Sequence, residues 1–242
     1  MITRKYKIAD KVVEVNSIYD EVHEYCSDYQ TDEPADYSVT TTQADIDFER
    51  QKSAREDEIE CIPIRHFSDS YLEELAVYRK LAEIMLDFNT VLFHGSVVAV
   101  DGVGYLFTAK SGTGKSTHTR LWRKYFGDRA VMVNDDKPLL HIADTVTAYG
   151  TPYNGKHRLG TNTSVPLKAI CILTRAEENH IEPITREQAY TMLLQQVYRP
   201  ADSILMMKTL TLVDSLADLV KLYRLGCNMD ISAAQVAFEG MQ

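Results

Sequence analysis

The sequence predicts an α/β protein with mixed β-sheets, a small N-terminal α+β extension and C-terminal helices. Two observations carry this prediction. Between residues 91 and 134, β-rich segments lead into a glycine-containing loop, a helical segment and a further strand. Short strand patterns and charged helical segments precede this core, and helical patterns dominate after residue 185. We therefore expect an extension over residues 1–90 and a core domain over residues 91–242.

The N-terminal extension combines strand and helix patterns. β-branched residues predict strands at 11–15 and 37–42, and a run of charged residues predicts a helix at 44–57. A second helix is expected at 68–88, where Ser70 and Glu73 stand at the spacing of a capping box. Apolar residues form a stripe along this second helix, which predicts that it packs against a core.

The core domain begins with a predicted hairpin. Its two β-rich segments meet at Asp101 and Gly102, a pair suited to the positive φ of a tight turn, and its second strand runs into the glycine-containing loop. The elements expected next are a helix at 116–126, strands at 129–134, 138–142 and 145–150, a loop at 151–166 and a strand at 167–175. This order of strand, loop, helix and strand is typical of α/β proteins.

The C-terminal part is expected to be mainly helical. Thr185 and Gln188 have the spacing of a capping box, and Asp230 can cap a terminal helix. Between these helices lies a predicted strand at 221–226. One face of a second helix is lined by Leu205, Leu212, Leu216 and Leu219.

Composition excludes several classes of protein. Apolar residues make up 45% of the 242 residues and charged residues 25%, which is the balance of a folded globular chain. The net charge of −9, with Lys and Arg scattered, argues against nucleic acid as a partner. Four widely spaced cysteines indicate a reducing compartment. Because there is no signal peptide and no apolar stretch of about 20 residues, we expect a cytoplasmic protein without a membrane partner.

Residues 109–116, AKSGTGKS, fit the phosphate-loop pattern G-x-x-x-x-G-K-[ST] except at the first position, which is Ala109. In such a loop, glycines let backbone N–H groups converge on phosphate oxygens at a helix N-terminus. Lys115 would reach the β- and γ-phosphates, and the Ser116 hydroxyl would coordinate Mg²⁺. The alternative is a glycine-rich turn without a ligand. With ATP and Mg²⁺ as the expected ligands, the predicted nucleotide-binding residues are Ser111, Gly112, Thr113, Gly114, Lys115, Ser116 and Thr117.

Two carboxylates, Asp135 and Asp136, follow the strand at 129–134. They lie about 20 residues beyond Lys115, the spacing that a helix and a return strand would span, so we expect them beside the loop. One carboxylate can hold Mg²⁺ and the other can accept the proton of an attacking hydroxyl. On the alternative interpretation, the pair ends a strand and caps a turn.

His94 and a cationic loop are further candidates. His94 lies in the strand before the hairpin and could stand alongside the glycine-containing loop, although a lone histidine in an apolar strand is more often a core residue. Lys156, His157 and Arg158 could clamp the transferring phosphate or an anionic group of the substrate. Equally, these three could be solvated loop charges.

These residues resemble the catalytic domain of the HPr kinase/phosphorylase family and, more distantly, the nucleotide site of PEP carboxykinases. In both families a loop S-G-x-G-K-[ST] is followed by an Asp-Asp strand end, which here are SGTGKST and NDD; the His94–Gly95 pair also looks like the kinase family's. The resemblance implies a two-sheet core of the PEP carboxykinase type, with Asp135 as the general base near His94 and Asp136 joining Ser116 at the metal. The additional N-terminal domain of HPr kinases is lacking, so HPr is not the expected substrate.

The leading hypothesis is an ATP-dependent kinase that transfers the γ-phosphoryl group to a hydroxyl of a small molecule such as an amino acid, of a peptide or of a protein, with Asp135, His94 and Lys115 as catalytic residues. A nucleotide-responsive binding module without phosphoryl transfer is the first alternative. A lyase like the PEP carboxykinases is the second, and the length of the chain argues against it. Members of the related families are commonly oligomers, so the resemblance also suggests a homo-oligomer.

Overall fold

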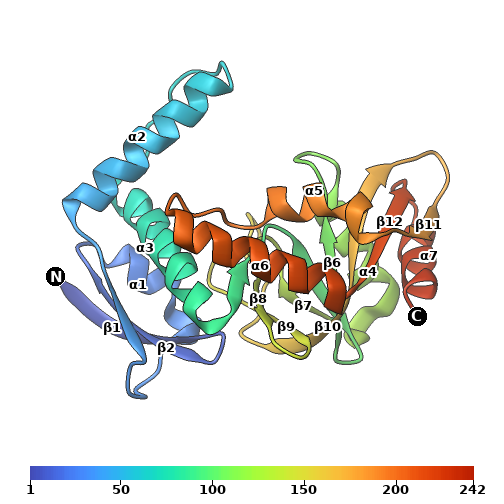
Figure 1. The fold of residues 1–242 in the computed structure, drawn as a ribbon, viewed down its shortest axis with the longest axis horizontal. Helices are drawn as coiled ribbons and strands as arrows, with labels where there is room; N and C mark the ends of the chain where they lie inside the picture. Colours follow the sequence, from blue (N-terminus) through green and yellow to red (C-terminus); the bar gives the residue numbers. More distant parts are fainter. The chain divides into compact units, whose positions relative to one another are not determined.

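The computed structural model describes residues 1–242, and the chain forms two compact units (Figure 1). Unit 1 comprises Met1–Ile84 and unit 2 comprises Met85–Gln242. Helices occur in both units together with parallel and antiparallel strand pairs, which confirms the α/β class. None of the helices combines the length and the apolar character that crossing a bilayer would require.

Unit 1 contains a three-stranded sheet in the order β1-β2-β3. Strands β1 (Ile2–Ile8) and β2 (Lys11–Ser17) form an antiparallel hairpin, and β3 (Tyr37–Thr40) lies parallel to β2. The helix α1 (Glu21–Tyr25) and the 3₁₀ turn η1 (Ser27–Tyr29) connect β2 to β3. The strands expected at 11–15 and 37–42 are confirmed, whereas β1, whose charged residues obscure the strand pattern, was not expected.

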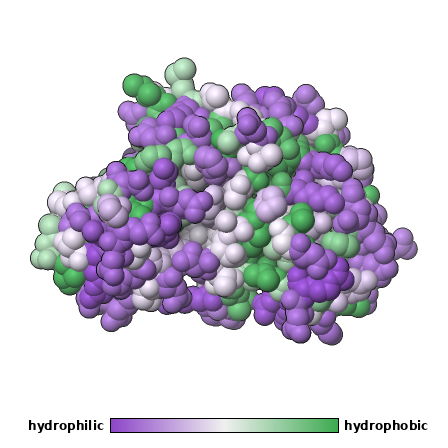
Figure 2. Space-filling model, turned by 90° about the horizontal axis from the view of Figure 1, so that it is seen from below, coloured by the Kyte–Doolittle hydropathy of each residue, from purple (hydrophilic) through white to green (hydrophobic).

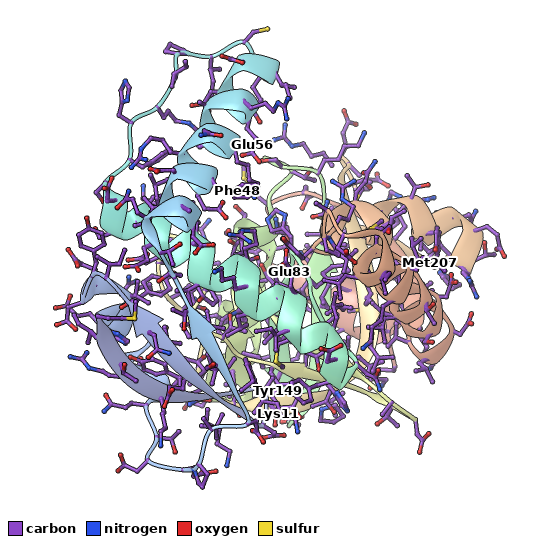
Figure 3. The ribbon with its side chains drawn as sticks, turned by 60° about the vertical axis from the view of Figure 1, so that its left-hand side comes forward. Lys11, Phe48, Glu56, Glu83, Tyr149 and Met207 are labelled. Carbon is purple, nitrogen blue, oxygen red and sulfur yellow. The ribbon has the colours of Figure 1, made fainter.

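Two long helices complete unit 1, α2 (Gln43–Ile59) and α3 (Asp69–Met85), whose last residue already belongs to unit 2. Arg79 on α3 places its guanidinium carbon 4.7 Å from the ring centroid of Phe48 on α2, which Figure 3 labels. The same guanidinium donates a hydrogen bond of 2.6 Å to the buried carboxylate of Glu49. Lys80 of α3 also donates to Asp45 of α2 at 2.8 Å, so Arg79 and Lys80 together hold the charged face of α2 against α3.

The predicted capping box at the start of α3 is wrong. The helix begins at Asp69, and the N–H of Tyr71 donates to Ser68 Oγ rather than to Ser70. Glu73 is fully buried, where its carboxylate accepts backbone N–H groups of β2's exit and a hydroxyl from Thr41. A carboxylate with three donors is better satisfied there than at an exposed helix end, so tertiary structure overrides the local signal.

Unit 2 is built on a nine-stranded sheet with the path β4-β8-β9-β10-β6-β5-β7, and β12 pairs with both β10 and β11. The strands are β4 (Thr90–Leu92), β5 (Ser96–Val100), β6 (Val103–Thr108), β7 (Ala130–Asn134), β8 (Leu139–Ile142), β9 (Val146–Tyr149), β10 (Ser164–Arg175), β11 (His180–Pro183) and β12 (Lys221–Cys227). Strand β10 is parallel to β6 and β12 and antiparallel to β9. The arrangement expected as two sheets is therefore continuous through β10.

Helices cover both faces of this sheet (Figure 1). The first core cluster packs strand residues against α5 (Arg186–Gln196) and α6 (Ser203–Leu219), and the second packs them against α4 (Lys115–Phe126) and α7 (Ser232–Gly240). Alternation along β6 sends Leu106 to the first cluster and Tyr105 and Phe107 to the second. The predicted capping box between Thr185 and Gln188 is present at the start of α5.

The surface of the molecule is largely polar. Figure 2 shows hydrophilic residues over most of the face in view, with hydrophobic residues in smaller patches between them. Two of the most exposed apolar side chains, Ile204 at 75% and Met207 at 70%, lie on the first turns of α6. Isolated exposed apolar residues of this kind are ordinary on a folded protein.

Candidate functional site

A tight loop joins β6 to α4. The backbone φ is +75° at Gly112 and +122° at Gly114, the residue before the helix begins at Lys115. A Cβ at either glycine would meet no atom within 4 Å, so conformation rather than crowding is what favours glycine there. The loop thus places two glycines at positive φ just before the N-terminus of α4.

Ala109, the departure from the phosphate-loop pattern, directly follows β6 and has no positive φ. Its side chain is fully buried in the same core cluster as Phe107 and Trp122. The methyl group therefore belongs to the packing between the sheet and α4, away from the two positions that require glycine.

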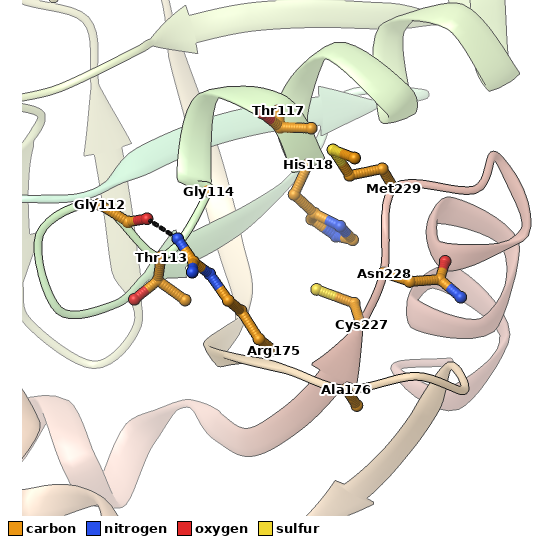
Figure 4. Close-up of a pocket in the computed structure, with 10 residues that line it drawn as sticks. All are labelled: Gly112, Thr113, Gly114, Thr117, His118, Arg175, Ala176, Cys227, Asn228 and Met229. Atoms are coloured by element: carbon orange, nitrogen blue, oxygen red, sulfur yellow. Dashed lines mark hydrogen bonds between the residues drawn. The ribbon is translucent and has the colours of Figure 1, made fainter.

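The loop is held from two sides. Thr113 donates both its N–H (3.2 Å) and its hydroxyl (2.8 Å) to the carbonyl of Lys110. Arg175 at the end of β10 donates to the carbonyl of Gly112 at 2.6 Å (Figure 4). Sequence reasoning missed Arg175, although the parallel pairing of β10 with β6 brings their carboxyl ends to one sheet edge, where such a residue can be sought.

Three side chains meet where α4 begins. The Nζ of Lys115 lies 3.3 Å from Nε2 of His94, and the same Nε2 lies 3.2 Å from Oδ1 of Asp136. His94 is positioned by its backbone, since its N–H donates to the carbonyl of Gln196 and its carbonyl accepts the hydroxyl of Thr108. The expectation that His94 stands alongside the loop thus agrees with this geometry, although His94 lies in the break between β4 and β5 and not inside a strand.

The electrostatics of this group are coupled. Burial lowers the pKa of Lys115, and the negative charge of Asp136 opposes that shift. Burial alone would raise the pKa of Asp136, but the hydrogen bond from His94 and the charges of Lys137 and Lys115 bring it below its ordinary value. Lysine only donates and an ionised carboxylate only accepts, so the single Nε2 atom of His94 can hydrogen-bond to only one of them at a time.

Asp135 is held by the segment that carries the predicted cationic residues. Its Oδ1 accepts the backbone N–H of Gly155 at 2.7 Å, and Asp136 is the carboxylate that faces His94.

A buried amide organises the turn that bears the two carboxylates. Asn134 accepts the N–H groups of Asp136 (2.9 Å) and Lys137 (2.5 Å) on Oδ1, and its Nδ2 donates to Thr151 Oγ1 at 3.1 Å. Asn134 and Thr151 are both fully buried. Sequence reasoning missed Asn134, although asparagine before a turn is a recognised signal for this kind of backbone bond.

Several of the other predicted site residues are exposed at the surface. Ser111 and Ser116 are exposed, the former in the loop and the latter in the first turn of α4. The side chains of Lys156, His157 and Arg158 are also exposed, and their segment reaches the carboxylates through the N–H of Gly155. No group of three or more His, Cys, Asp or Glu side chains forms a metal-binding cluster.

A pocket of about 460 Å³ adjoins the loop (Figure 4). One side is formed by the loop and the first turn of α4, and the other by the segment that follows β12. Its lining includes Gly112, Thr117, His118, Arg175, Cys227 and Met229. The volume is within the range of pockets that hold small molecules.

The fold and the site together define an α/β protein with a glycine loop at a helix N-terminus, faced by a lysine, a histidine and a carboxylate. The family described as SynChlorMet cassette protein ScmC matches residues 63–229, well over half of the chain, and the chain belongs to this family. A structure of the HPr(Ser) kinase/phosphatase from Coxiella burnetii is 14% identical to it, covering 51% of this chain and 93% of that chain at a TM-score of 0.29. None of the curated proteins matches the chain.

Proposed function

We propose that this chain is an ATP-dependent phosphotransferase that transfers the γ-phosphoryl group to a hydroxyl of an amino acid, peptide or protein. The observation that carries this proposal is the meeting of Lys115, His94 and Asp136 at the N-terminus of α4, beside a loop with two glycines at positive φ. This combination joins an anion-binding backbone to a cation and a carboxylate, which are the parts that phosphoryl transfer uses. A P-loop core of the PEP carboxykinase type belongs to the same proposal.

The residues of the loop fit a nucleotide. The first-turn N–H groups of α4 have no acceptor within the helix, so they are available to phosphate oxygens. Lys115 would contact the β- and γ-phosphates, and Thr117 the α-phosphate. Ser116 and Asp136 would hold Mg²⁺, since hydroxyl and carboxylate oxygens suit that ion. When bound, Mg²⁺ neutralises charge that develops on the transferring phosphoryl group.

The two carboxylates suit different roles. Asp136, whose pKa is lowered, stays ionised and is the better partner for a cation. Asp135 has one oxygen held by the N–H of Gly155 and one that the bond leaves available to accept a proton. In the proposed step the acceptor oxygen bonds to the γ-phosphorus, the bond to the β–γ bridging oxygen breaks, ADP leaves, and the hydroxyl proton passes to Asp135.

The test is to incubate the protein with γ-labelled ATP, Mg²⁺ and pools of amino acids, peptides and proteins, and to follow the label. We expect Asp135→Asn to keep ATP affinity while transfer falls by about 10²- to 10⁴-fold. Asp136→Asn should instead weaken the Mg²⁺-dependent part of ATP binding. Asp144→Asn, which changes an exposed carboxylate in the turn between β8 and β9, is the matched control and should change neither.

Two results would contradict the proposal. ATP bound with no label transferred to any acceptor would favour the nucleotide-responsive binding module. If ATP did not bind in the presence of Mg²⁺, ATP would be excluded as the ligand of the loop. If the two variants exchanged their effects, phosphoryl transfer would stand and the roles of Asp135 and Asp136 would be reversed.

A further inference from the structure

His118 contributes an unusual polar atom to the pocket beside the loop. The residue lies on the first turns of α4, is only 2% exposed and lines the pocket. Its Nδ1 is buried and has no hydrogen-bond partner. Figure 4 shows the ring projecting from α4 into the space between Met229 and Cys227. A buried polar atom without a partner is costly unless something else supplies one.

The protonation state of His118 follows from its neighbour Trp122. The indole N–H of Trp122 can only donate, and it lies 3.0 Å from Nε2 of His118, so Nε2 is the acceptor. An Nε2 atom that accepts a hydrogen bond carries no proton, so the ring is neutral and bears a single proton. The single ring proton must therefore sit on Nδ1. Phe107 packs edge-on at 4.6 Å between ring centroids and holds the ring in place.

The other groups of the pocket favour a flat, largely apolar ligand. The amide of Asn228 is already used, since it donates to the carbonyl of Glu177 and accepts the N–H of Asp230. Cys227 and Met229 present sulfur atoms, and Met229 is 78% exposed, so its flexible side chain can move aside for a ligand. Thr113, Thr117 and Arg175 also line the pocket, but His118 Nδ1 is the lining atom that is buried without a hydrogen-bond partner.

We propose that this pocket holds the purine base of the nucleotide, and that the Nδ1–H of His118 donates a hydrogen bond to a ring nitrogen of that base. The inference rests on the proposed function in one respect, that the phosphates bind the adjoining loop. Because the loop forms one wall of the pocket, a single nucleotide can place its phosphates on α4 and its base beside His118. His118 is then the residue that reads the acceptor edge of the base.

The chain provides its own probe for the base. Cys227 lines the pocket, whereas Cys61 is exposed in unit 1 and serves as an internal control. Cys26 and Cys171 are buried, and burial raises the pKa of both thiols, so neither should react. Burial also raises the pKa of the partly exposed Cys227 thiol, so labelling is carried out at mildly alkaline pH. N-ethylmaleimide labelling, read by mass spectrometry, then reports on Cys227 and Cys61 in the same sample.

We expect ATP at ten times its Kd to slow labelling of Cys227 about tenfold, because only the free protein reacts. Inorganic tripolyphosphate at the same saturation should leave the rate at Cys227 unchanged, and neither ligand should alter Cys61. ATP that binds without protecting Cys227 would overturn the placement of the base and leave the phosphate site intact. If neither ATP nor tripolyphosphate binds, the proposed function falls and this inference falls with it.

A second measurement tests the hydrogen bond itself. His118→Phe should weaken ATP about fivefold, the usual worth of one neutral hydrogen bond, and leave tripolyphosphate unaffected. His118→Gln, which can accept from Trp122 and still donate to the base, should restore most of that affinity. Among the 1-, 3- and 7-deaza analogues of ATP, one should bind the unaltered protein about fivefold more weakly than ATP, and this difference should vanish in His118→Phe. Equal affinity for all four nucleotides would overturn the role of His118 even if the variants fail to fold.

Discussion

Asn134 shows how one side chain positions others at the residue scale. Its amide joins the turn at Asp136 and Lys137 to Thr151, so two chain segments that carry predicted site residues share one buried group. Its Nδ2 also lies within hydrogen-bond distance of the carbonyls of Thr151 and Tyr153, and Asn134 itself is fully buried. The direction in which Asp136 points therefore depends on a residue that itself has no proposed chemistry.

We expect Asn134→Ala to lower the free energy of unfolding by about 2–4 kcal/mol, because it leaves several buried polar groups without partners. The measurement is urea unfolding followed by the fluorescence of Trp122, the only tryptophan in the chain. Phosphoryl transfer, where measurable, should fall in the folded variant through misplacement of Asp136. A change below about 0.5 kcal/mol would mean that the turn holds without the amide.

At the scale of elements, the unit that matters is β6, its loop and α4. The strand leads into the buried Ala109, the loop has two glycines at positive φ, and the helix carries Lys115 and His118 about one turn apart. Each part has a different physical requirement. At position 109 the packing of the core favours alanine, and at position 114 the positive φ favours glycine.

These requirements predict different effects of two substitutions that each change one methyl group. Gly114→Ala introduces a Cβ at φ +122°, which costs about 1–3 kcal/mol of strain, and ATP affinity should fall by at least about tenfold. Ala109→Gly should leave ATP affinity within about twofold while lowering stability by about 1 kcal/mol. Titration calorimetry with ATP and thermal unfolding measure both. Equal loss of affinity in the two variants would mean that Ala109 also shapes the phosphate site.

At the scale of the whole molecule, pH changes the free energy of unfolding. His118 is held neutral in the folded state, with its pKa lowered from 6.5 to about 3 by burial. As the pH falls below 6.5, the unfolded chain binds a proton that the folded chain refuses, so unfolding becomes more favourable. The stabilising contribution of the neutral ring is therefore complete above that pH and declines towards pH 3.

We expect the free energy of unfolding to fall as the pH is lowered through this window. The His118→Phe variant should reduce the slope of this free energy against pH by at most about 1.4 kcal/mol per pH unit. The measurement is denaturant unfolding at a series of pH values, followed by Trp122 fluorescence. His157→Gln, which changes an exposed histidine of the same unit, is the matched control and should keep the full slope. An unchanged slope in His118→Phe would show that His118 takes up its proton without unfolding.

Local patterns determined much of this protein. The α/β class, the hairpin at Asp101 and Gly102, the helix after the loop and the capping box at Thr185 are all decided by neighbours in sequence, through β-branching, turn chemistry and capping. The phosphate-loop pattern likewise places Gly112 and Gly114 where the backbone has positive φ, a conformation that glycine adopts readily and other residues rarely do. The capping box expected at Ser70 and Glu73 was wrong because a buried carboxylate found better partners far away in the chain.

Only the tertiary structure decided which groups meet. Strand order brings His94 to Lys115, the turn after β7 brings Asp136 to His94, and β10 carries Arg175 to the carbonyl of Gly112. The pocket at His118 depends on the return of β12 beside α4, some hundred residues later in the chain. Contacts of this kind follow from the register of strands and the direction of side chains, which no window of sequence specifies.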